Sequence, residues 1–191
     1  SQLGKETVKF TYSTVSKKAR SKNYEVSLAW LKFANVVINC SLVTEGRYPL
    51  NAYEEPNTFK IYYSDVGLLT LKGSISPNKI IQNIDISDKV RGMLAESYVA
   101  EQLAANGFSL HYWECNNTSE VDFVIHINDE PIPLETKSAD NVKAKSLRTY
   151  ISKYNPKYSI KVSTKNFGFE NNIKSVPLYA VFCIKEHNEE Q

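Results

Sequence analysis

Two short stretches carry acidic and basic residues at spacings that suit phosphate chemistry. Glu135 and Lys137 stand two residues apart in Leu-Glu-Thr-Lys, and side chains two apart on a strand project to the same side. The preceding apolar run contains Asp122, which the same alternation places opposite Val121 and Phe123. If these two runs are neighbouring strands, two carboxylates and a lysine gather at one place.

A third carboxylate, Glu96, falls within a predicted helix. Ser87 can cap this helix, which we expect to run to about Asn106, with Gly107 just beyond its end. Glu96 shares a helical face with apolar residues such as Met93 and Leu103. An unpaired carboxylate is costly to bury, so Glu96 should either meet a cation or reach the edge of the core.

The connection between the two strands decides whether their side chains meet. A two-residue loop of Asn128 and Asp129 would pair Asp122 with Glu135, whereas a four-residue loop from Asn128 to Pro131 would pair Asp122 with Lys137. Either even-length loop puts these groups on one face, and an odd loop or a bulge would not.

Carboxylates that converge in this way favour a hard divalent cation. Glu96, Asp122 and Glu135 are the candidate ligands for Mg²⁺ or Mn²⁺, which can acidify water and screen phosphate charge. Lys137 could stabilise the charge on phosphorus oxygens in the transition state. The four candidate catalytic residues, with Lys137 included, therefore predict phosphodiester hydrolysis.

The elements that must position these residues alternate between helix and strand from residue 87 onward. After the helix that carries Glu96, the patterns predict strands at 109–115, 121–127 and 132–136, a helix at 142–154 and strands at 158–163 and 176–184. This order indicates an α/β domain over 87–191, with a mixed sheet flanked by helices.

The first part of the chain has a different pattern. Helices are predicted at 11–19 and 21–37, the latter with an apolar side that includes Val26, Trp30 and Phe33. A strand over 36–43, a loop over 44–58 and a returning strand over 59–64 follow, which suggests a small winged-helix-like unit within 1–71. Residues 72–86, with Gly, Ser and Pro, are the expected linker.

Several of these stretches resemble a known family. Glu-Val-Asp-Phe-Val at 120–124 followed by Pro-Leu-Glu-Thr-Lys-Ser at 133–138 is similar to the core of the PD-(D/E)xK nuclease superfamily, which has a restriction-endonuclease-like fold. More closely, the chain resembles the uncharacterised C-terminal region of bacterial and archaeal AAA+-type ATPases. This closer likeness includes Tyr-Ser-Asp-Val-Gly-Leu-Leu at 63–69 and Gly-Met-Leu-Ala-Glu at 92–96.

The resemblance implies a role for each candidate residue. Glu96 would match the carboxylate on the helix, Asp122 the central metal ligand, and Glu135 and Lys137 the E-x-K pair. Val121 stands where the superfamily motif has proline. In such proteins a nucleotide-binding ATPase domain precedes this region. The chain contains no G-x-x-x-x-G-K-[ST] loop, so we expect a C-terminal fragment that binds no nucleotide itself.

Two groups of basic residues suggest contact with DNA. The 23 basic and 21 acidic residues nearly balance, so any attraction to nucleic acid must come from local patches. The candidates lie between the first two predicted helices and on the later helix, and their alternative role is a solvated surface. They are Lys17, Lys18, Arg20, Lys22, Lys143, Lys145 and Arg148.

The cysteine content and the length of the apolar runs indicate the cellular compartment. The cysteines Cys40, Cys115 and Cys183 are odd in number and far apart, which favours a reducing compartment. No apolar run approaches the roughly 20 residues that a membrane helix needs. We therefore expect a soluble cytoplasmic protein without a membrane partner.

Three kinds of function fit these observations. The first is a metal-dependent DNA endonuclease module, and the second is a catalytically inactive DNA-binding or protein-interaction module that serves an ATPase domain. The third is a purely structural domain in which the charged cluster is a buried ion-pair network.

Overall fold

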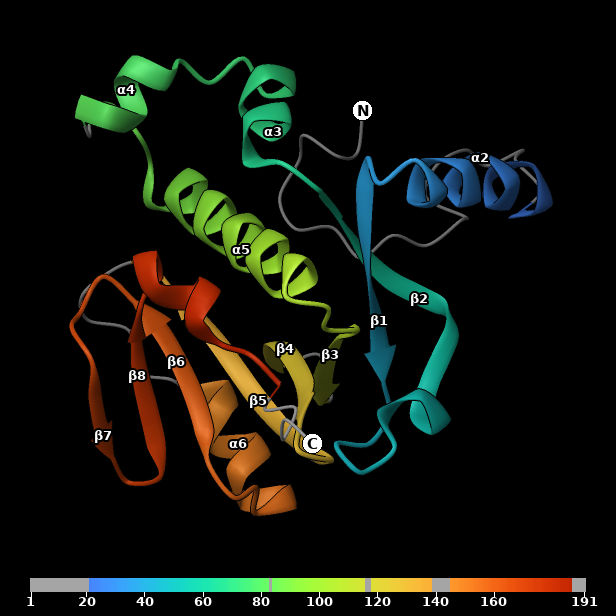
Figure 1. The fold of residues 1–191 in the computed structure, drawn as a ribbon, viewed down its shortest axis with the longest axis vertical. Helices are drawn as coiled ribbons and strands as arrows, with labels where there is room; N and C mark the ends of the chain where they lie inside the picture. The colour runs from blue at the N-terminus through green and yellow to red at the C-terminus, as the bar shows by residue number, and fades with distance from the viewer. Residues whose placement is uncertain (1–20, 83, 116–117, 139–144, 187–191) are drawn as a thin grey trace, which may run out of the picture.

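A computed structural model describes residues 21–82, 84–115, 118–138 and 145–186. The strands form one eight-stranded mixed sheet, in the order β2-β1-β3-β4-β5-β6-β8-β7, which crosses the whole molecule (Figure 1). The elements are α2 (Ser21–Phe33), β1 (Val37–Val43), η2 (Leu50–Tyr53), β2 (Glu54–Tyr63), α3 (Val66–Lys72), α4 (Pro77–Gln82), α5 (Asp88–Ala105), β3 (Leu110–Cys115), β4 (Ser119–Ile127), β5 (Glu130–Lys137), α6 (Lys145–Tyr154), β6 (Ser159–Ser163), β7 (Gly168–Glu170), β8 (Ile173–Pro177) and η3 (Leu178–Cys183).

The centre of the fold follows the predicted order of elements. Ser87 caps α5 by accepting a hydrogen bond from the Val90 N–H, and Gly107 beyond its end has a φ of 87°. Strands β3, β4 and β5 form an antiparallel meander, and β6 lies parallel to β5 after the α6 connection. The predicted mixed α/β architecture with flanking helices is confirmed.

The β4–β5 hairpin has the two-residue loop that the sequence allowed. Asn128 and Asp129 both have positive φ, 51° and 61°, as a type I′ turn requires. Ile127 therefore pairs with Glu130, and the ladder continues to Phe123 opposite Leu134. This register directs Asp122 toward the E-x-K stretch.

The end of the chain differs from the prediction. The expected strand over 176–184 is wrong, because β8 ends at Pro177 and the next residues form the 3₁₀ helix η3. A short hairpin of β7 and β8 precedes it, turning through Asn171 and Asn172, both with positive φ. Proline has no N–H to continue the ladder, which explains where β8 ends.

The first strands belong to the same sheet as the later ones. β1 pairs with β2 in antiparallel fashion and with β3 in parallel, so residues 37–63 extend the sheet of the part that we expected to begin at residue 87. Helix α4 lies inside the expected linker over 72–86. The helix predicted over 11–19 lies outside the described residues.

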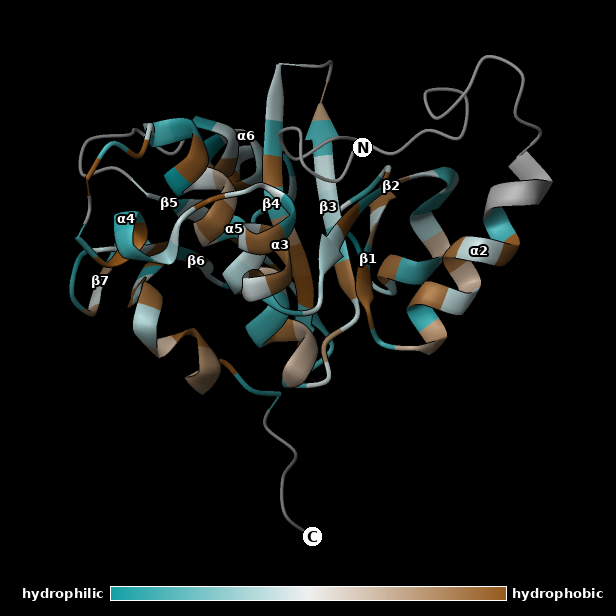
Figure 2. Ribbon diagram, turned by 90° about the horizontal axis from the view of Figure 1, so that it is seen from above, coloured by the Kyte–Doolittle hydropathy of each residue, from teal (hydrophilic) through white to brown (hydrophobic). Residues whose placement is uncertain are grey.

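Helix α2 ends at Phe33, earlier than predicted, and Asn35 follows with a positive φ of 52°. Its expected apolar side faces outward: Trp30 is 67% and Phe33 82% exposed, whereas Leu28 packs against Val37 and Phe59. Figure 2 shows hydrophobic residues along α2, at the β1–β2 end of the molecule.

Helices α5 and α6 lie on the two faces of the sheet (Figure 1). Each packs on its own apolar core. The larger core joins α5 to Phe123, Leu134 and Ile160 of the sheet, and the smaller joins α6 to Trp113, Val121 and Val124. Because Phe123 and Val124 are consecutive residues of β4, the two cores lie on opposite faces of the sheet. Of the helices that the structure describes, none has the length and apolar character needed to cross a membrane.

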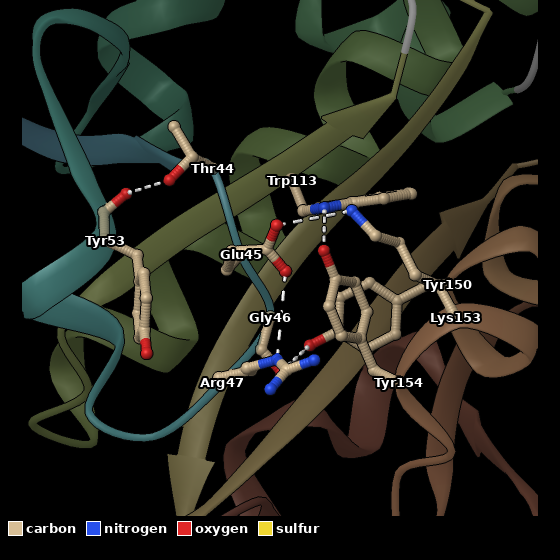
Figure 3. Close-up of polar contacts among 9 residues, drawn as sticks. All are labelled: Thr44, Glu45, Gly46, Arg47, Tyr53, Trp113, Tyr150, Lys153 and Tyr154. Atoms are coloured by element: carbon tan, nitrogen blue, oxygen red, sulfur yellow. Dashed lines mark hydrogen bonds and ion pairs between the residues drawn. The ribbon is translucent and has the colours of Figure 1, made fainter.

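Helix α6 makes polar contacts with the β1–η2 loop and with β3, drawn in Figure 3. The Tyr150 hydroxyl donates to the Gly46 carbonyl at 3.3 Å, and the Trp113 indole N–H donates to the Tyr154 hydroxyl at 3.1 Å. Lys153 forms an ion pair with Glu45 at 3.5 Å. These contacts set the position of the helix that follows the E-x-K strand.

Candidate functional site

A buried lysine joins the helix carboxylate to the sheet. Lys60, on β2, is only 2% exposed, and its Nζ lies 3.1 Å from Glu96 Oε1 and 2.6 Å from Glu120 Oε1. The Tyr62 hydroxyl donates to the same Glu96 oxygen at 2.6 Å. Glu96 thus meets a cation, which was one of the two outcomes expected for a carboxylate on an apolar helix face.

The neighbouring groups determine the protonation states of Lys60 and Tyr62. Burial alone would lower the pKa of Lys60, but the carboxylates of Glu96, Glu120 and Asp122 outweigh it and raise that pKa above its ordinary value. Burial, together with Glu96, raises the pKa of Tyr62 well above its ordinary value. Lys60 therefore remains charged and Tyr62 remains a hydrogen-bond donor.

Asp122 lies at a β-bulge. Val121 pairs with Trp113 and Val124 with His111, so β4 has two residues where β3 has one. Strict alternation is broken here, and Phe123 packs on the α5 side while Val121 packs on the α6 side. The expectation that both lie on the face opposite Asp122 is therefore wrong. Bulges of this kind redirect a side chain.

The backbone pairing between β4 and β5 ends at Phe123 and Leu134. Beyond it, a side-chain carboxylate on β4, that of Asp122, accepts a hydrogen bond from the backbone of β5. Asp122 Oδ2 accepts from the Thr136 N–H at 2.7 Å. Burial and then the charge of Glu96 raise the pKa of Asp122 to about 8, although Lys60 and the Thr136 hydrogen bond oppose the shift. At neutral pH this carboxyl group therefore keeps its proton unless a cation binds beside it.

Glu135 and Lys137 project together, as predicted, with Lys137 Nζ 2.5 Å from Glu135 Oε1. Leu134 packs in the α5-side core, so alternation directs Glu135 and Lys137 to the other side of β5. Glu135 is 2% exposed, and its second oxygen, Oε2, is buried without a hydrogen-bond partner. A buried carboxylate oxygen without a partner is free to coordinate a cation.

The predicted carboxylates Glu96, Asp122 and Glu135 interact electrostatically, but they are not arranged to coordinate one metal ion together. The charge of Glu96 and, to a smaller extent, that of Glu135 raise the pKa of Asp122, so both carboxylates act on it. In the described part of the chain, no group of three or more His, Cys, Asp or Glu side chains is arranged to hold a metal ion. Lys60 and Tyr62 already engage Glu96 Oε1.

Two carboxylates are enough for Mg²⁺, which commonly completes its coordination with water and substrate phosphate. Asp122 and Glu135 fit this pattern, because Glu135 Oε2 has no partner and Asp122 is a buried carboxyl group on which the charge of Glu135 acts. The network joins four carboxyl groups to the two ammonium groups of Lys60 and Lys137. A divalent cation would balance the difference in the fully ionised network, in which Asp122 has lost its proton.

The predicted DNA-contacting residues are only partly described. Lys17, Lys18, Arg20 and Lys143 lie outside the described residues, and the side chain of Lys22 in α2 is likewise outside them. Lys145 and Arg148 are exposed on α6. The start of that helix lies beside the start of β4, where the Thr149 and Ser119 hydroxyls are 3.4 Å apart.

Sequence reasoning did not identify Lys60 and Tyr62 as site residues. A weak signal was available: Lys60 and Tyr62 are two apart on a predicted strand and therefore share a face, between the apolar residues Phe59 and Ile61. A lysine at such a position needs an acidic partner if it is buried. The sequence does not show which carboxylates it meets, because β2 and α5 are far apart along the chain.

Comparison with known proteins gives two matches, each covering less than half of the chain. Residues 91–181 match a domain of unknown function, DUF4143, and residues 1–79 match another, DUF8612. DUF4143 domains are in general found in AAA-ATPase-associated proteins, in line with the closer resemblance seen in the sequence. Neither match is to a nuclease or a winged-helix family. No curated protein and no solved structure matches the chain.

Proposed function

We propose that the chain carries a restriction-endonuclease-like domain that hydrolyses phosphodiester bonds in DNA with Mg²⁺ or Mn²⁺. The unit formed by α5, β3, β4, β5, α6 and β6 supports this, because it places Asp122 where a bulged strand separates from the E-x-K strand. The observation that carries the proposal is the buried, unpartnered Glu135 Oε2 beside Asp122 and Lys137.

Each side chain then has a distinct task. Asp122 and Glu135 would hold the cation, which when bound supplies Lewis-acid chemistry and screens phosphate charge. The Thr136 N–H orients Asp122 through its 2.7 Å hydrogen bond. Lys137, 21% exposed, keeps an ammonium group at the solvent-facing end of this pair and can stabilise negative charge on the phosphate.

DNA would approach from the side of the sheet to which Glu135 and Lys137 project. Helix α6 packs on this side, and its exposed Lys145 and Arg148 are suited to phosphate contacts that hold the duplex without reading its sequence. Lys161 on β6 pairs directly with Glu135 and adds a further basic residue beside the site.

Cleavage of supercoiled plasmid and of labelled single-stranded DNA, with Mg²⁺ or Mn²⁺, tests the proposal. We expect cleavage by the unaltered chain and a loss of at least about 100-fold in Lys137→Ala and in Asp122→Asn, as for removal of a transition-state contact. Lys79→Ala is the matched control, because Lys79 is an exposed lysine in α4, distant in the chain from the site. Cleavage that survives both site substitutions would contradict the proposal.

A second candidate function is a catalytically inactive module that binds DNA or a protein partner for an ATPase domain. The ion pairs of Lys60 with Glu96 and Glu120 favour it, since they engage carboxylates that a metal would otherwise use. Salt-sensitive DNA binding without cleavage or metal binding would support this candidate.

A further inference from the structure

The carboxylate cluster contains a cation that comes from a different part of the chain. Lys60 lies within residues 1–79, which match one family, whereas Glu96, Glu120 and Asp122 lie within residues 91–181, which match the other. The ammonium group crosses the Tyr112 ring, 5.0 Å from its centroid, to reach Glu120 on β4. A lysine from residues 1–79 thus supplies a positive charge to the carboxylates of residues 91–181.

Lys60 occupies the position that a second metal ion would need. Its Nζ bridges Glu96 Oε1 and Glu120 Oε1, and Tyr62 uses the same Glu96 oxygen. Both lone-pair directions of that oxygen are therefore engaged by donors from β2. Glu135, in contrast, retains a buried oxygen without a partner.

We propose that Lys60 acts as an internal cation that withholds Glu96 Oε1 from metal coordination, so that the site binds one divalent ion, held by Asp122 and Glu135. This inference rests on the proposed function for the identity of the ion, and it assigns Lys60 a positioning role. Lys60 offsets one of the two negative charges of Glu96 and Glu120, while Glu135 Oε2 has no partner and stays open to the ion.

A charged side chain in this role makes metal binding depend on residues that never touch the ion. Removing the ammonium group leaves Glu96 and Glu120 without a cation, and a buried carboxylate without one is strongly unfavourable. A second divalent ion would relieve that imbalance. The number of ions bound is therefore a readout that a merely structural lysine would not change.

The test is titration of the whole chain with Mn²⁺, followed by calorimetry and by electron paramagnetic resonance of free Mn²⁺. We expect one ion in the unaltered chain, two in Lys60→Met, and one in Lys60→Met/Glu96→Gln. Two ions in the unaltered chain, or one in Lys60→Met, would overturn the inference and leave the proposed function standing. No binding to the unaltered chain but binding to Lys60→Met would contradict both, because each expects one ion in the unaltered chain. One ion in the unaltered chain without DNA cleavage would sink the proposed function alone.

A second variant keeps the inference testable if Lys60→Met does not fold, which circular dichroism would reveal. Glu96→Gln retains the Lys60–Glu120 pair and the Tyr62 hydroxyl as a neighbour. We expect its Mn²⁺ dissociation constant to stay within about threefold of the unaltered value, well short of the roughly 10- to 100-fold loss seen when a supporting group of a metal site is removed. A loss of about 100-fold or more would identify Glu96 as a ligand and refute the inference. If neither the unaltered chain nor any variant binds Mn²⁺, both proposals fail.

Discussion

At the scale of single residues, the site is defined by how each carboxylate is satisfied. Glu96 has an ammonium group and a phenol as partners, Asp122 has a backbone N–H, and Glu135 has Lys137 on one oxygen only. The sequence predicted these three acids and Lys137 from their spacing, from the helical face of Glu96 and from the resemblance to a nuclease superfamily. It could not identify Lys60, because its role depends on long-range packing between β2 and α5.

The raised pKa of Asp122 predicts how stability changes with pH. Burial and Glu96 raise this pKa from an ordinary 3.8 to about 8, so the folded chain keeps a proton that the unfolded chain loses near pH 4. Tighter proton binding by the folded state means that this contribution to stability is complete below about pH 4. It is then lost as pH rises toward about 8.

Asp122→Asn should remove this dependence, because an amide can still accept the Thr136 hydrogen bond but cannot ionise. Relative to the unaltered chain, we expect the variant to gain more than about 1 kcal/mol of unfolding free energy between about pH 5 and pH 9. Urea denaturation in EDTA-containing buffer measures this. Asp85→Asn, at an exposed position, provides the control, and parallel pH profiles for the unaltered chain and Asp122→Asn would contradict the prediction.

At the scale of elements, the sequence predicted correctly those features that depend on residues close together in the chain. The Ser87 cap, the glycine after α5 and the Asn128–Asp129 loop all act within a few residues, and each was found as expected. The bulge at Asp122 and the η3 helix were missed. The bulge arises from pairing with β3, and η3 replaces a strand-like apolar run whose side chains pack against α5. Both depend on partners distant in sequence.

The hairpin that sets the site register can be strengthened through its turn. Asp129 has a φ of 61°, a conformation that glycine adopts without the penalty of a Cβ atom. Asp129→Gly should therefore raise the free energy of unfolding by about 0.5–1 kcal/mol. Asp129→Ala removes the same charge but keeps Cβ, and we expect it to destabilise. Equal effects of the two substitutions in thermal denaturation would show that charge, and not backbone conformation, matters here.

The packing of α6 depends on a close approach at Gly46. A Cβ atom there would lie 2.2 Å from the hydroxyl of Tyr150, which is fully buried and also donates to the Gly46 carbonyl. Gly46→Ala should destabilise the protein by about 1–3 kcal/mol through overpacking. Gly168→Ala is the matched control, since its Cβ would meet Ser175 at an ordinary 3.9 Å. Similar melting temperatures for the two variants would argue against this packing.

At the scale of the whole molecule, the two segments that match different families contribute strands to the same sheet and side chains to the same network of ion pairs. Residues 1–79 contribute β1 and β2, and residues 91–181 contribute β3 to β8. The parallel β1–β3 pair joins them, with Cys40 opposite Leu110, and Cys40, Tyr62 and Leu103 share the larger core. The expected division at residues 72–86 followed composition, which carries no information on how the strands pair.

This joint sheet predicts that the later part of the chain does not fold alone. A chain of residues 87–191 would lose β1 from the edge of β3, and it would lose Lys60 and Tyr62, which leaves Glu96 without its partners. We expect no cooperative thermal transition by circular dichroism, whereas the whole chain should unfold in a single transition. Exposed strand edges of this kind also favour aggregation.

Supplying residues 1–86 as a separate chain should restore the fold, because the division between Ile86 and Ser87 lies between α4 and α5 and breaks none of the contacts named above. Co-expression followed by size-exclusion chromatography and hydrogen exchange would measure this, with protection of β3 amides as the readout. Lys60→Met in the separate 1–86 chain should weaken the complex, since it removes both ion pairs across the division. If residues 87–191 alone show protection of β3 equal to that in the whole chain, β1 and Lys60 are additions to an independent domain.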